Sequence, residues 1–238
     1  MTVRLYLEDA ALRAAACVVV AVGAEGIVLD RTPFYPRAGG QPGDAGVLRW
    51  MDGAVEVSEA RKGEGDVVLH VPVPDAALPM PGTMVHAELD WPRRFGDMRM
   101  HTAMHLLCAL LPGASVTGGQ VGAERSRLDF DLAAAPDRDA LDVGLAALVS
   151  ADHLVTTEWV DEAVLDANPG LVRTLSVQPP RGSGRVRLVR IGSGGHLVDL
   201  QPCGGTHVAR TGEIGAVRVL KVENKGRQNR RISIGLTA

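Results

Sequence analysis

Aromatic side chains are scarce in this chain, because only 3% of its 238 residues are Phe, Trp or Tyr. A hydrophobic core therefore has to come mainly from Val, Leu, Ala and Ile, and hydrophobic residues make up 46% of the sequence. No apolar run reaches the roughly 18 residues that a membrane-spanning helix needs. The N-terminus, with acidic Glu8 and Asp9, lacks the apolar stretch of a signal peptide, so we expect a cytoplasmic protein without a membrane span.

The sequence also has few cysteines and no net positive charge. Three cysteines, an odd number, favour a reducing compartment over a disulfide framework. The formal net charge of −3 gives no overall attraction to nucleic acid. Any contact with RNA therefore has to come from a local basic patch.

The N-terminal part of the chain has the pattern of short strands. Runs rich in β-branched residues at 18–22, 26–30, 67–71 and 85–90 are separated by glycines and prolines. Short strands with frequent turns predict a small β-barrel. Proline restricts the residue before it, so we place the domain boundary at Trp91-Pro92 and expect an N-terminal domain of residues 1–91.

Residues 92–238 mix helices and strands. The apolar spacing predicts helices over 94–111 and 137–150, the first of them ended by Pro112-Gly113. Strands are expected at 128–132, 154–160, 186–191, 196–200, 215–223 and 231–236. The predicted fold class is α+β: a small barrel, then an α+β domain whose first helix lies against an antiparallel sheet.

Two histidine motifs lie about a hundred residues apart. His101 and His105 are one helical turn apart on one face of the expected helix, so both imidazoles can reach one ion. Cys203 and His207 flank a Gly-Gly-Thr segment that suits a tight loop. These four side chains are a ligand set for Zn²⁺. Cys108, seven residues after His101, competes as a third ligand, but a cysteine on an apolar helix is usually a small buried hydrophobe, so Cys203 is preferred.

These motifs carry a family resemblance. The segments HTAMHLL and CGGTH, in this order and at this separation, resemble the editing domain shared by alanyl-tRNA synthetase and the free-standing AlaX proteins. The glycine-rich segment 34–46, the segments 116–120 and 127–130, and the end of the chain at 211–215 and 225–231 are similar to the same family. The length of the match is that of the medium-sized AlaX form.

The resemblance implies ATP-independent hydrolysis, in trans, of the ester joining a wrong amino acid to the tRNA for alanine. Serine is the expected amino acid and glycine a second one, because an alanine pocket cannot strongly reject either. Water attacks the ester carbonyl, and zinc either lowers the pKa of this water or polarises the substrate. We expect no obligate protein partner.

The resemblance also suggests contact residues. The substrate-binding candidates are Gln41, Asp44, Thr117, Gly118, Gly119 and Gln120. Flexible cations suit phosphate oxygens, and the expected tRNA-binding residues are Lys221, Lys225, Arg227, Arg230 and Arg231, with Arg93, Arg94 and Arg99 as further candidates. Thr102 faces away from His105 by helical spacing and is interpreted as structural. Met104 stands where synthetase versions often carry threonine.

Two questions stay open at this level. Four protein ligands close a tetrahedral zinc site, whereas catalysis needs an open position, so His207 either binds the metal or stands off it as a catalytic group. The function also has rivals. One is a zinc-dependent hydrolase of small esters or amides that never touches RNA, and the other is a non-catalytic tRNA-binding module with structural zinc.

Overall fold

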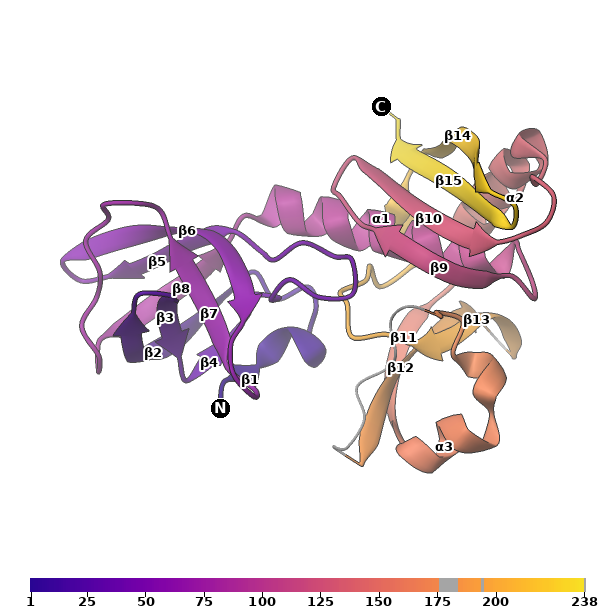
Figure 1. Ribbon diagram of the computed structural model, residues 1–238. Coiled ribbons are helices and arrows are strands. Elements are labelled where there is room, and N and C mark those ends of the chain that lie inside the picture. Colours follow the sequence, from indigo (N-terminus) through magenta and orange to yellow (C-terminus); the bar gives the residue numbers. More distant parts are fainter. Residues whose placement is uncertain (176–183, 194, 238) are drawn as a thin grey trace. The chain divides into compact units, whose positions relative to one another are not determined.

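A computed structural model describes residues 1–175, 184–193 and 195–237, which divide into unit 1, Met1–Asp97, and unit 2, Met98–Ala238 (Figure 1). Unit 1 is built around a closed barrel with the strand order β2-β3-β7-β6-β5-β8, in which all neighbours are antiparallel. The strands are β2 Ala14–Gly23, β3 Gly26–Leu29, β5 Gly46–Trp50, β6 Gly53–Lys62, β7 Val68–Pro72 and β8 Met84–Leu89. Outside the barrel, β1 Val3–Arg4 pairs in parallel with β4 Arg31–Thr32, and Leu5–Leu7 form a 3-10 turn. The predicted small barrel is confirmed.

Alternation along the strands explains the barrel core. In β8, Val85, Ala87 and Leu89 are buried, whereas the residues between them are exposed. A period of two places one set of side chains inside a closed sheet and the other in solvent. The interior is almost entirely aliphatic, with Phe34 as its large aromatic side chain.

A buried ion pair joins the glycine-rich segment 34–46 to the first turn of helix α1, Trp91–Ala109. Asp44 accepts hydrogen bonds from Nε of Arg94 at 2.9 and 3.0 Å, and Nη2 of Arg94 also contacts this carboxylate. The remaining donors of Arg94 reach the carbonyls of Pro33 (2.7 Å) and Ala10 (3.0 Å). Because both charges are buried, the full set of hydrogen bonds is what makes this pair tolerable in the interior.

Unit 2 contains two antiparallel sheets and most of the first helix. Helix α1, Trp91–Ala109, starts in unit 1, and from Met98 onward its residues belong to unit 2. The four-stranded sheet has the order β14-β15-β10-β9, and the three-stranded sheet has the order β11-β12-β13. The strands are β9 Ser115–Gln120, β10 Arg125–Asp131, β11 Val155–Asp161, β12 Arg185–Ser193, β13 His196–Pro202, β14 Val217–Gly226 and β15 Asn229–Leu236. Helices α2 Arg138–Ser150 and α3 Glu162–Ala167, with 3-10 turns at Pro169–Leu171 and Thr211–Ile214, complete the unit.

The second half of α1 is buried on all sides. Every residue from His101 to Cys108 is buried. On one side, a Cβ placed on Gly119 of β9 would lie 3.4 Å from Cε of Met104, so this strand contacts the helix, and 2.9 Å from the side chain of Leu128, so glycine makes room for Leu128 of β10. The predicted arrangement of this helix against an antiparallel sheet is confirmed, and Figure 1 shows α1 beside β9 and β10. None of the helices in the described ranges is long and apolar enough to cross a membrane.

His70 lies in the barrel interior and links stability to pH. Its Nδ1–H donates to the carbonyl of Ile27 at 3.0 Å, and the Thr32 hydroxyl lies 2.7 Å from its Nε2. Burial lowers the pKa of His70 from 6.5 to about 4. Between these pH values the unfolded chain binds one proton more than the folded chain, so the free energy of unfolding falls as the pH falls.

We expect acidification from pH 7 to pH 4 to reduce the free energy of unfolding through His70 by about 3 kcal/mol. The measurement is urea unfolding across this range for the wild type and for His70→Gln, whose side chain does not titrate. The difference between the two proteins should shrink as the pH drops. A constant difference would show that His70 is not held neutral by the fold.

Candidate metal centre

The two histidine motifs meet inside unit 2. The ligand atoms of His101, His105, Cys203 and His207 all lie within 4.8 Å of one another. Sγ of Cys203 is 3.5 Å from Nε2 of His101 and 3.4 Å from Nε2 of His207. Helix α1 presents the first two donors from one face, and the loop after β13 presents the other two. Four converging nitrogen and sulfur donors could hold one metal ion.

Cys108 is not part of this group. It is buried in the apolar interior, and burial raises the pKa of its thiol to about 12. A thiol with this pKa stays protonated and is a poor ligand, because the thiolate is the form that binds metal. The competing placement of Cys108 as third ligand is therefore not favoured by the structure.

A carboxylate on β13 orients His105. Nδ1 of His105 lies 2.8 Å from Oδ2 of Asp199, and Nε2 of Gln201 donates to the same oxygen at 2.8 Å. An ionised carboxylate only accepts, so Nδ1 carries a proton, and Nε2 is the ring atom left to face the other three ligand atoms of the cluster. Carboxylate–histidine pairs of this kind are the usual support of a metal-binding imidazole.

Thr102 orients His207 in the same way. Its hydroxyl donates to the carbonyl of Met98 at 2.9 Å, so its oxygen accepts from Nδ1–H of His207 at 3.2 Å and from the amide of Val208 at 3.3 Å. This leaves Nε2 of His207 deprotonated and facing Cys203. The interpretation of Thr102 as structural therefore holds only in part, since the residue also fixes a donor of the cluster.

The electrostatics of the cluster favour a cation. Burial would raise the pKa of Cys203, but the neighbouring His101 and His207 imidazoles outweigh this, and the pKa is well below its usual value. Burial alone would lower the pKa of His105, yet Asp199 and Cys203 raise it to about 10. Burial lowers the pKa of His207 to about 3. A thiolate beside a carboxylate makes this interior negative, and a metal cation fits such a site.

The loop that carries Cys203 is held by a buried arginine. Nη1 of Arg187, on β12, donates to the carbonyls of Cys203 at 2.8 Å and Gly205 at 3.0 Å. The amide of Gly205 in turn lies 3.4 Å from Sγ of Cys203. Gly204 has no positive φ, and a Cβ there would meet no atom within 4 Å, so the loop does not depend on glycine at this position.

The predicted substrate residues lie in two places. Thr117, Gly118, Gly119 and Gln120 are in β9, which touches α1 at Met104, next to His105. Oγ1 of Thr117 is buried and has no hydrogen-bond partner among the described residues. Gln41 and Asp44 are buried in unit 1, where Asp44 is bonded to Arg94.

The predicted tRNA-binding cations are largely engaged within the protein. Arg231 makes two hydrogen bonds to Asp129, at 2.7 and 2.8 Å, and Lys221 and Lys225 both pair with Glu223. Arg230 is buried and donates to the carbonyls of Gly226 and Asn229, among others. Arg227 is exposed at the β14–β15 turn. Fewer cationic side chains are therefore exposed and unpaired in this region than the sequence suggested, among the residues that the structure describes.

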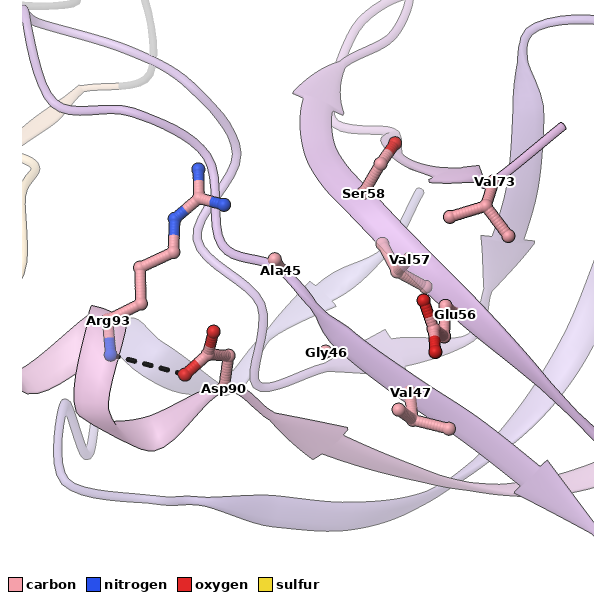
Figure 2. Close-up of a pocket in the computed structure, with 9 residues that line it drawn as sticks. All are labelled: Ala45, Gly46, Val47, Glu56, Val57, Ser58, Val73, Asp90 and Arg93. Carbon is pink, nitrogen blue, oxygen red and sulfur yellow. Dashed lines mark hydrogen bonds between the residues drawn. The ribbon is translucent and has the colours of Figure 1, made fainter.

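A cavity of about 390 Å³ lies elsewhere, in unit 1, between β5, β6 and the start of α1 (Figure 2). Its polar lining includes Glu56, Asp90 and Arg93, and the amide of Arg93 donates to Asp90 at 3.3 Å. It contains none of the four metal-cluster donors. The residues that could hold a metal are in the buried cluster of unit 2 instead.

Sequence reasoning missed Arg187, Thr102, Asp199 and Gln201 as parts of the site. One signal was available for two of them: Asp199 and Gln201 alternate on a strand that leads directly to Cys203, so both face the same side. Arg187 gave no such signal, because its contacts depend on how β12 pairs with β13.

Comparison with known proteins shows full-length relatives. The family described as "Threonyl and Alanyl tRNA synthetase second additional domain" matches residues 186–233, and "tRNA synthetases class II (A)" matches residues 11–93. The chain is 37% identical to the alanyl-tRNA editing protein AlaX-M of Methanosarcina acetivorans over 98% of both chains. It is 32% identical to the AlaX-M protein of Saccharolobus solfataricus, again over 98% of each. It is also 34% identical to the alanine–tRNA ligase of Pyrobaculum arsenaticum, covering 93% of this chain and 25% of the ligase.

Replacing Arg187 by Met is expected to destabilise unit 2 by about 2 kcal/mol or more, because two buried carbonyls lose their donor. Chemical denaturation monitored by circular dichroism measures the change. Arg190→Met, on the same strand, is the matched control, because the Arg190 side chain makes no hydrogen bond or ion pair among the described residues. Equal stability of the two variants would contradict the role of Arg187 in holding the loop.

Proposed function

The chain belongs to the AlaX-M family of alanyl-tRNA editing proteins, and we propose that it hydrolyses the ester joining serine to the tRNA for alanine. Glycine is the proposed second substrate. The observation that carries the proposal is the buried cluster of His101, His105, Cys203 and His207, two of whose members lie on the helix that β9, the strand of Thr117, contacts at Met104. We further propose that the cluster holds Zn²⁺, because two or more imidazoles with a thiolate are the donor set that zinc prefers.

The chain's own residues prepare the metal site. Asp199 and Thr102 hold the imidazoles of His105 and His207 in the tautomers that present Nε2. Arg187 and the Gly205 amide hold the Cys203 loop. Zinc, when bound, supplies Lewis acidity that polarises an ester or a water molecule.

Thr117 is the proposed recognition group for serine. Its buried hydroxyl has no partner among the described residues, so a substrate hydroxyl can complete its hydrogen bonding. Alanine and glycine carry no such group and would leave Thr117 unpaired. Such a site distinguishes serine from alanine by hydrogen bonding, whereas the aminoacylation pocket of a synthetase for alanine cannot separate the two strongly by size. Gly118, Gly119 and Gln120 on the same strand are proposed to line the approach of the amino acid.

Lys221, Lys225 and Arg227 are proposed to contact tRNA from the β14–β15 hairpin. All three are exposed, and Lys221 and Lys225 share the single carboxylate of Glu223. Arg230 and Arg231 are proposed to support this hairpin from within, through their contacts to main-chain carbonyls and to Asp129. Gln41 remains a proposed substrate contact, and Asp44 a proposed support for the segment that carries it.

The purified protein is expected to release serine from seryl-tRNA for alanine, to release glycine more slowly, and to leave alanyl-tRNA intact. Zinc should be present in about equimolar amount, and a chelator should abolish release. The assay follows radiolabelled amino acid on each charged tRNA, with alanyl-tRNA as the matched control. No serine release would overturn the proposal and leave a non-catalytic tRNA-binding module, whereas hydrolysis of simple esters without tRNA would favour the small-molecule hydrolase.

Replacing Thr117 by Val is expected to lower kcat/KM for seryl-tRNA by about 10- to 100-fold, because the shape is kept and one hydrogen bond is lost. The weak rate on glycyl-tRNA should hardly change. Ser115→Ala, on the same strand, is the control and should leave both rates as in the wild type. Equal losses on serine and glycine substrates would show that Thr117 does not read the hydroxyl.

A further inference from the structure

A cluster of two arginines and one glutamate lies on the surface of unit 1. Nε of Arg37 donates to Oε1 of Glu59 at 2.6 Å, and Nε of Arg61 donates to Oε2 at 2.9 Å. The Glu59 side chain is only 8% exposed, whereas those of Arg37 and Arg61 are 65% and 57% exposed. One buried carboxylate therefore anchors two guanidinium groups that face solvent.

The backbone fixes these three residues relative to one another. The amide of Arg37 donates to the carbonyl of Ala60 at 3.0 Å, and the amide of Ala60 donates to the carbonyl of Asp44 at 2.8 Å. A Cβ on Gly43 would come within 1.9 Å of the Ala60 carbonyl oxygen, so glycine lets the segment lie directly on β6. The segment that carries Arg37 is thus paired to the strand that carries Arg61.

The cluster keeps an excess of positive charge. Burial would raise the pKa of Glu59, but hydrogen bonds from Arg61 and Arg37 outweigh burial and hold the pKa below its usual value. Glu59 is therefore ionised at neutral pH and cancels one of the two arginine charges. The Arg49–Glu88 and Arg31–Asp30 pairs, also on unit 1, each match one cation with one carboxylate.

Both exposed guanidinium groups keep unused donors. Among the residues that the structure describes, none accepts a hydrogen bond from Nη1 of Arg37 or from either Nη of Arg61. Arg37 contacts Glu59 through Nε and Nη2, and Arg61 contacts it through Nε, so each guanidinium keeps N–H groups that Glu59 does not use. Planar guanidinium groups held in this way match phosphate oxygens, and the side-chain entropy is already lost before binding.

The rest of unit 1 offers no general attraction for RNA. Residues 1–97 contain nine Lys and Arg and fourteen Asp and Glu. A polyanion must therefore bind at a local excess of positive charge if it binds this unit at all.

We propose that Arg37 and Arg61 bind phosphate groups of the RNA substrate, with Glu59 as the residue that positions both. The proposal rests on the proposed function, which makes RNA the substrate. Such contacts position the RNA without reading its sequence. Arg37 and Arg61 are distinct from the tRNA-binding residues that the sequence predicts at 221–231.

The test compares binding of uncharged tRNA for alanine to the triple variant R37Q/E59Q/R61Q and to R49Q. Both variants lose one net positive charge, and Arg49 is equally exposed, at 57%. We expect the triple variant to bind about tenfold more weakly, and its plot of log K against log salt to be shallower by about 1.4–1.8, which is two phosphate contacts. R49Q should bind as the wild type does. Fluorescence anisotropy over a salt series gives both quantities.

R37Q alone guards against misfolding, because Arg61 still pairs with Glu59. It should reduce the salt slope by about 0.7–0.9. In deacylation assays the variants should raise KM and keep kcat, since contacts of this kind do not change between bound substrate and transition state. Wild-type affinity and slope in a folded triple variant, or equal losses in R49Q, would overturn the proposal. Absence of serine release by the wild type would overturn the proposed function instead, and the binding comparison would still decide on the arginine pair.

Discussion

Two distant segments of backbone have to bring four donor atoms to one buried point, and much of unit 2 serves this requirement. His101 and His105 need one face of a rigid helix, and Cys203 and His207 need a loop whose ends cannot drift. An imidazole or thiolate in the interior is costly unless each polar atom has a partner. Partner groups are therefore as much a part of the site as the donors.

The partners come from elements that the donors do not occupy. Asp199 approaches His105 from β13, and Arg187 reaches the Cys203 loop from β12. Thr102 uses the helix itself, because its hydroxyl gives its proton to the carbonyl four residues earlier and so can only accept from His207. The pairing of β12 with β13 in the three-stranded sheet thus determines how the metal-ligating side chains are oriented. Loss of register in that sheet would disturb the cluster without touching a donor.

The sequence was sufficient to predict an element wherever a single helical or strand periodicity determines which residues share a face. A helical period placed His101 and His105 together, and strand alternation predicted the barrel, including β8. The strands β5, β6 and β9 were missed, since glycine or charge interrupts their apolar pattern. Arg230 shows the other limit: its buried side chain donates to the carbonyl of Gly226, which the β14–β15 turn brings close. From the sequence alone such a residue looks like an exposed cation, because its burial and its hydrogen bonds to carbonyls depend on the tertiary structure.

The hydrogen bonds of His207 help to decide whether this residue binds the proposed zinc or stands away from it. Moving His207 away would break its bond to Thr102 and leave a buried donor unpaired, at a cost of about 1–3 kcal/mol. Its Nε2 already lies 3.4 Å from Sγ of Cys203, a spacing compatible with two ligands on one ion. These contacts favour the interpretation in which all four donors stay on the metal. The four residues would then hold the proposed zinc, which would supply Lewis acidity to the substrate, and discrimination between amino acids would fall to polar side chains such as Thr117.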